Sequence, residues 1–66
     1  MEIILNGQPD RRPGSETVAE LIESLGLEGS PCAVEVNRQI IPKSQHEQRQ
    51  LEDGDRVEVV TLVGGG

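Results

Sequence analysis

Alternation of hydrophobic and polar residues predicts β-strands near both ends and in the middle of the chain. Neighbouring side chains in a strand point to opposite faces, so an apolar residue at every second position indicates one buried face. The pattern predicts strands at Glu2–Asn6, Cys32–Asn37 and Arg56–Val63, and a short strand at Ile40–Ile41 ended by Pro42. Asn6-Gly7 is typical of a type I′ hairpin turn. In the return segment, Gln8–Arg12, Pro9 permits only a weak edge strand.

One short amphipathic helix is predicted after this hairpin. Thr17 and Glu20 have the spacing of a capping box, which marks a helix N-terminus. Gly26 follows as a left-handed C-cap, and we expect Leu27 to fold back onto the last turn. The apolar stripe occupies positions i, i+3, i+4 and i+7, at Val18, Leu21, Ile22 and Leu25.

The segment between the short strand and the last strand has no clear period. Lys43–Gln50 is predicted to be a polar loop with one possible helical turn, Leu51 to be its apolar anchor, and Glu52–Asp55 to be a turn. Four or five short strands and one helix predict an α+β fold with the helix on one face of the sheet. No second helical layer is available, so we expect the other face to stay open to solvent or to a partner.

Composition limits the classes of function. The 66 residues allow one domain, the formal net charge is −6, and there is no Phe, Trp or Tyr. Nucleic-acid binding needs clustered cations and usually stacking aromatics, so we expect no nucleic-acid partner. No apolar run is long enough for a membrane span, so no membrane partner is expected. The single cysteine, Cys32, excludes an intramolecular disulfide and favours a reducing, cytoplasmic compartment.

The candidate chemistry lies at the end of the chain. Val57 and Val59 are expected on the buried face of the last strand, which leaves Val60 and Leu62 on the open face as a candidate docking patch. Three glycines, Gly64–Gly66, follow; without side chains they can thread a narrow channel and present one carboxylate. A frayed end without function is the alternative for the tail, and Leu62 folding over the sheet edge is the alternative for the patch.

Other polar residues are expected to have structural roles. Cys32 is predicted to be a small buried thiol and His46 a solvated side chain, and one Cys with one His makes a poor metal site, so no metal is predicted. Most of the glutamates on or near the helix (Glu16, Glu20, Glu23 and Glu28) are predicted to form a solvated polar face, and Glu16 and Glu20 also to favour the helix N-terminus. Asp53 and Asp55 are expected to cap their turn.

Taken together and in order, several motifs resemble the sulfur carrier proteins of thiamine biosynthesis, the ThiS family. They are Asn6-Gly7, Thr17-Val-Ala-Glu-Leu21, Ala33-Val-Glu-Val-Asn37, Ile41-Pro42, Leu51-Glu-Asp-Gly-Asp-Arg-Val-Glu-Val59 and Val63-Gly-Gly-Gly66. The resemblance implies the ubiquitin-like β-grasp fold, a mixed sheet of four to five strands with one amphipathic helix. The domain would then be residues 1–63, followed by a flexible tail at residues 64–66. The family's usual Asn-Gly after the third strand is Asn37-Arg38 here, so a different turn type is expected.

The resemblance also implies a function, that of a protein co-substrate and not an enzyme. An adenylating activating enzyme would use ATP and magnesium to adenylate Gly66, while the carrier itself would bind no cofactor. Sulfur supplied indirectly by a cysteine desulfurase would convert Gly66 to a thiocarboxylate, which would donate sulfur to thiazole synthase. Gly64 and Gly65 would thread the partner active sites, and Val60 and Leu62 would dock. The alternatives are the small subunit of molybdopterin synthase, which is typically longer and richer in aromatics, and a β-grasp binding module with an idle tail.

Overall fold

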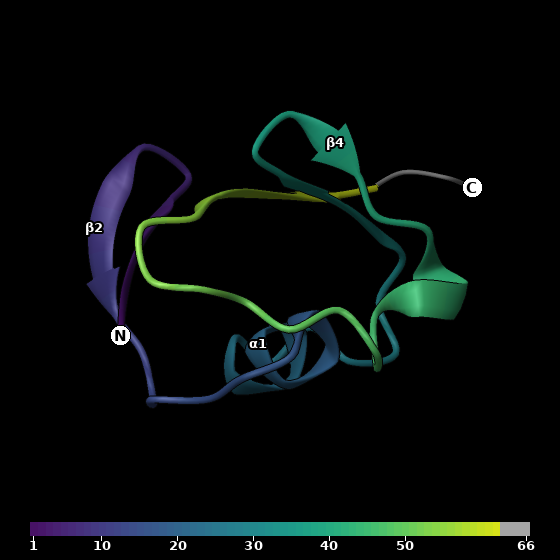
Figure 1. The fold of residues 1–66 in the computed structure, drawn as a ribbon. Helices are drawn as coiled ribbons and strands as arrows, with labels where there is room; N and C mark the ends of the chain where they lie inside the picture. Colours follow the sequence, from purple (N-terminus) through teal and green to yellow (C-terminus); the bar gives the residue numbers. More distant parts are fainter. Residues whose placement is uncertain (63–66) are drawn as a thin grey trace.

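The described part of the chain folds as one five-stranded sheet with one α-helix on one face (Figure 1). A computed structural model describes residues 1–62. The elements in chain order are β1 (Glu2–Leu5), β2 (Gln8–Arg11), α1 (Val18–Ser24), β3 (Cys32–Val36), β4 (Gln39–Ile40), a 3₁₀ turn η1 (Lys43–Gln45) and β5 (Arg56–Thr61). The strand order is β2-β1-β5-β3-β4, with β1 and β5 parallel and the other neighbours antiparallel. The sheet is therefore mixed, as expected, and β5 is its central strand.

The hydrophobic core lies between α1 and one face of the sheet. Val57 and Val59 of β5 and Val34 and Val36 of β3 face the helix, as their alternation predicts. The buried apolar cluster consists of Ile3, Val18, Leu21, Ile22, Val34, Val36, Ile41, Leu51, Val57 and Val59. Every member is aliphatic, so the core depends on close packing of small side chains.

Helix α1 has the predicted caps at both ends. The Thr17 hydroxyl accepts from the Glu20 N–H at 3.1 Å, and the Glu20 carboxylate accepts from the Thr17 N–H at 2.8 Å, which completes the capping box. Gly26 has φ +74°, and the Leu27 N–H donates to the Ile22 carbonyl, so the helix ends in a Schellman motif. Leu25 was predicted in the apolar stripe, but it is 38% exposed because it is the C-cap, beyond the last packed turn.

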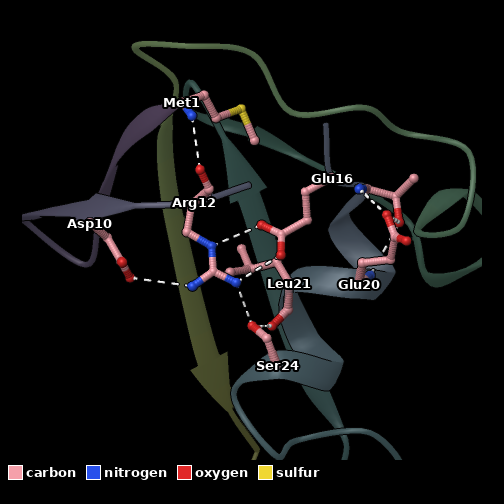
Figure 2. A network of polar contacts seen from close by, with 8 residues as sticks. Met1, Asp10, Arg12, Glu16, Glu20, Leu21 and Ser24 are labelled. Atoms are coloured by element: carbon pink, nitrogen blue, oxygen red, sulfur yellow. Dashed lines mark hydrogen bonds and ion pairs between the residues drawn. The ribbon is translucent and has the colours of Figure 1, made fainter. Parts of the chain in front are cut away.

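A polar clamp joins the first hairpin to the helix (Figure 2). The Arg12 guanidinium donates to both carboxylate oxygens of Glu16 at 2.8 and 2.7 Å and also to the Ser24 hydroxyl. Hydrogen bonding to Glu16 raises the pKa of Arg12; burial opposes this, and the charges of Glu16 and Asp10 reinforce it. Glu16 is only 4% exposed, so its prediction as part of a solvated face was wrong. A bidentate partner lets this carboxylate be buried with its charge compensated.

Both hairpin turns place two consecutive residues at positive φ, as a type I′ turn requires. Asn6 and Gly7 have φ +50° and +84°, which confirms the first turn. Asn37 and Arg38 have φ +52° and +69°. The expectation of a different second turn type was therefore wrong. Arg38 adopts a left-handed backbone conformation, which is unfavourable for a residue that has a Cβ atom.

The loop between β4 and β5 contacts the N-terminus of α1. The N–H groups of Val18 and Ala19, which have no partner inside the helix, donate to the carbonyls of Arg49 and His46, each at 2.9 Å. Leu51 is buried, as predicted. His46 is only 8% exposed, with its Nε2 2.9 Å from the Ile41 carbonyl oxygen, so its assignment as a solvated side chain was wrong. The loop has a buried polar side that its sequence did not show.

In the Asp-Gly-Asp turn before β5, Asp55 caps the turn, as expected, whereas the Asp53 carboxylate bonds to β1 instead, so the prediction that Asp53 caps the turn was wrong. Asp55 accepts from the Glu52 N–H at 2.8 Å, and Asp53 accepts from the Glu2 N–H at 2.7 Å. Asp55 also accepts from the Asn37 side chain at 3.0 Å. This turn therefore ties the start of β5 to β1 and to the second hairpin.

Replacing Arg12 by alanine tests the clamp. Arg12→Ala leaves the Glu16 carboxylate buried without its partner, so we expect the free energy of unfolding to fall by roughly 2–4 kcal/mol. The neighbouring Arg11 is exposed, and Arg11→Ala should change it by less than about 0.5 kcal/mol. Urea denaturation of the two variants measures the difference. Equal losses would contradict the role of the clamp.

Replacing Arg38 by glycine tests the strain in the second turn. Arg38→Gly removes the steric strain of a left-handed backbone at a residue with a Cβ atom, which costs about 1–2 kcal/mol. Because glycine also increases the entropy of the unfolded chain, we expect a net stabilisation of about 0.5–1 kcal/mol. Arg38→Ala deletes the charge but keeps the Cβ, and it should not stabilise the protein. If thermal unfolding shows the same gain for both, the backbone conformation is not the cause.

Candidate functional site

Strand β5 carries the chain from the core to the candidate site at its C-terminal end. It pairs with β3 from Val36↔Val57 to Cys32↔Thr61, and with β1 through Ile4↔Arg56 and Leu5↔Val57. The side chains of Val57 and Val59, which are 1% and 9% exposed, anchor the strand in the core. Strand β5 is therefore held on both sides, by β1 at its start and by β3 along its length.

Exposed apolar side chains lie at the predicted docking positions. Val60 is 56% exposed and Leu62 is 54% exposed. Val60 pairs with Ala33 on the face opposite the helix, which agrees with the predicted open face. Contiguous exposed apolar groups are typical of contact surfaces for another protein.

Leu62 lies at the border of a pocket that alternation did not predict. This pocket, of about 460 Å³, lies between residue 62 after β5, the side of α1, the loop of residues 27–31 and the segment of residues 43–47. Its lining includes Ile22, Leu27, Cys32, His46 and Leu62. The Leu62 N–H donates to the Pro31 carbonyl at 2.9 Å, which holds Leu62 against the start of β3. Leu62 thus lies at the end of the sheet, between the open face and this pocket.

Two carboxylates lie opposite each other on the open face. Glu58 of β5 pairs directly with Glu35 of β3, and Glu35 pairs with Ile40 of β4. Like charges in directly opposed positions are destabilising, so the sheet gains nothing from this pair. Ile40, 72% exposed on the same face, was not singled out from the sequence. The sequence did contain a signal for its exposure, because an isoleucine on a two-residue edge strand has few neighbouring side chains to cover it.

The three predicted tail residues, Gly64, Gly65 and Gly66, lie outside the described residues, as do residue 63 and the boundary between domain and tail. Cys32 was predicted to be buried, but it is half-buried and borders the pocket, because it begins β3 at the end of the sheet. Within residues 1–62, no three His, Cys, Asp or Glu side chains gather where they could hold a metal ion. In the same residues, no helix is long and apolar enough to span a membrane.

The fold and the exposed end of β5 define a small β-grasp domain with a surface suited to protein contacts. Comparison with known proteins agrees with this class. A family model described as "ThiS family" matches residues 3–66. The chain belongs to the ThiS family.

Individual relatives give the same result. The chain is 33% identical over 66 residues to the sulfur carrier protein ThiS of Escherichia coli, with 100% of both chains covered. It is 39% identical over 66 residues to a thiazole synthase of Paramagnetospirillum magneticum, of which it spans 20%. A crystal structure of a thiamine biosynthesis protein (ThiS) from Geobacter metallireducens superposes with a TM-score of 0.85 at 29% identity, covering 100% of both chains. The β-grasp fold expected from the sequence is confirmed.

Proposed function

We propose that this chain is a sulfur carrier for thiazole formation in thiamine biosynthesis, and that Gly66 is the residue that carries the sulfur. The observation that carries this proposal is the extent of the family match, which runs through Gly66 and so includes all three glycines. The chain also aligns over its whole length with the sulfur carrier of Escherichia coli. In this role the protein is a co-substrate, and partner enzymes supply the catalytic groups.

The chemistry at Gly66 takes place in two stages. A carboxylate is a poor electrophile, so an activating enzyme with ATP and magnesium first transfers an adenylyl group to it and releases pyrophosphate. A persulfide sulfur, derived from a cysteine desulfurase, then attacks the acyl carbon and displaces AMP. A second thiol attacks the outer sulfur of the resulting acyl disulfide and breaks its S–S bond, which releases a new disulfide and leaves a thiocarboxylate on Gly66. The carrier itself needs no nucleotide or metal site for either stage.

Thiazole synthase is the proposed acceptor of the sulfur. One supporting fact is that a region 39% identical to this chain makes up 20% of the Paramagnetospirillum thiazole synthase. A carrier-like segment within that protein suits direct transfer, because a shared chain raises the effective concentration of the donor. In the present chain, Val60 and Leu62 form the proposed docking patch, and Gly64 and Gly65 the segment that enters the partner's active site.

Charge supports the same kind of encounter. The net charge of −6, together with Glu35 and Glu58 on the open face, would steer the carrier toward a basic surface on a partner enzyme. This steering acts between exposed groups, so added salt should slow the association. The apolar patch would then provide most of the contact energy.

Intact-mass spectrometry tests the modification. Incubation with an activating enzyme of this class, ATP, magnesium and a persulfide donor should add the mass difference between sulfur and oxygen, and fragmentation should place it on Gly66. Deleting Gly65-Gly66 should abolish the product. The melting temperature should hardly change, because the core is built from residues between Ile3 and Val59.

Two results would contradict this proposal. An unchanged mass for the full chain, with an activating enzyme shown to modify its own carrier, would favour a binding module with an idle tail. A large loss of stability on deleting Gly65-Gly66 would make the tail a structural element instead.

Replacing Leu62 by aspartate tests the docking patch. Because burying one leucine contributes roughly 1.5–3 kcal/mol, Leu62→Asp should weaken binding to the activating enzyme by about tenfold or more. Leu25 is also exposed but does not line the pocket beside Leu62, so Leu25→Asp should bind normally. Isothermal titration gives both affinities, and thermal unfolding checks that each variant is folded. Equal affinities for the two variants would remove Leu62 from the interface.

A further inference from the structure

Strand β5 extends further than the backbone of its parallel neighbour can support. The last β1–β5 pair is Leu5↔Val57, while β5 continues to Thr61. The Asn6 N–H still donates to the Val57 carbonyl at 2.9 Å, but the chain then turns away at Asn6-Gly7. On this side, β5 therefore loses its backbone partner before it reaches Val60 and Leu62.

The side chain of Asn6 takes the place of the missing strand. Its Oδ1 accepts from the Val59 N–H at 2.9 Å, and its Nδ2 lies 3.4 Å from the Val59 carbonyl, to which it donates. A carboxamide carries a C=O acceptor and an N–H donor, so it can pair with a strand as a peptide unit does. The turn itself does not need this group, since glycine would also adopt φ +50°.

We propose that Asn6 is a positioning residue, which holds the C-terminal half of β5 so that the docking patch and Gly66 are presented together. This inference rests on the proposed carrier function. Four residues follow Leu62 up to Gly66, and four residues of extended chain reach at most about 14 Å. A partner that grips Val60 and Leu62 can receive the Gly66 carboxylate only within that reach, so a shift at Val59 would misplace both.

The second hairpin offers a matched control at the other end of the strand. Asn37 has φ +52°, and its Oδ1 accepts from the Arg56 N–H at 3.0 Å while its Nδ2 donates to Asp55. It therefore clamps the start of β5 with the same chemistry as Asn6. Asn37→Gly removes comparable hydrogen bonds far from the docking patch, while Asn6→Gly removes those next to it.

Kinetics with the activating enzyme, with the full chain as the varied substrate, separate positioning from stability. Both glycine variants should lower the melting temperature, because each loses side-chain hydrogen bonds. Asn6→Gly should raise KM by about fivefold to tenfold and change kcat by less than about twofold, because docking is impaired before the chemistry. Asn37→Gly should leave KM within about twofold of the wild type. Asn6→Asp, which keeps the acceptor for the Val59 N–H, should restore part of the loss.

Amide hydrogen exchange gives a readout that does not depend on activity. Exchange of the Val59 amide should accelerate about tenfold in Asn6→Gly after correction for global stability, and it should not do so in Asn37→Gly. An unchanged KM in Asn6→Gly, or an equal rise in both variants, would overturn the positioning role while leaving the carrier function intact. If the wild type forms no thiocarboxylate, the carrier function fails, and the positioning role fails with it even where exchange shows that the clamp exists.

Discussion

The structure depends on the pairing of β5 between β1 and β3 above a core of aliphatic side chains. Val57 and Val59 contribute to that core, and the ladder with β3 continues to Thr61. The same strand carries Val60 on its open face and leads directly to Leu62. One element therefore both stabilises the domain and sets the direction in which the chain leaves it. This division would suit the proposed carrier role, in which Gly66 must reach a partner enzyme while the domain that precedes it stays rigid.

Polar clamps supply order that so small a core would not give alone. Arg12 with Glu16 fixes the first hairpin to the helix, and the carbonyls of Arg49 and His46 close the N-terminus of α1. Asn6 and Asn37 hold the two ends of β5. Each of these contacts either satisfies a backbone hydrogen-bonding group or pairs a buried charge with its partner. A domain with few apolar residues needs such contacts, because they let it pack without unpaired polar groups.

Local patterns predicted most of the fold because they depend on neighbours in the sequence. The capping box, the Asn6-Gly7 turn and the alternation of Val57 and Val59 each follow from a few adjacent residues. The burial of Glu16 and His46 could not be predicted in this way, since each depends on how separate segments pack together. The contact of Asn6 with Val59 spans 53 residues and left no local signal. The tail and Val60 were found as candidates from the sequence, whereas the pocket beside Leu62 needed the packed helix.

Isotope transfer can show whether the sulfur on Gly66 enters the thiazole ring. The carrier would be charged with ³⁴S at Gly66, purified away from its sulfur source and incubated with thiazole synthase and the remaining substrates in unlabelled buffer. If Gly66 carries the sulfur, the thiazole ring should acquire the heavy sulfur and the carrier should return to its carboxylate mass. A thiazole product that contains only light sulfur, while the label stays on the carrier, would contradict it.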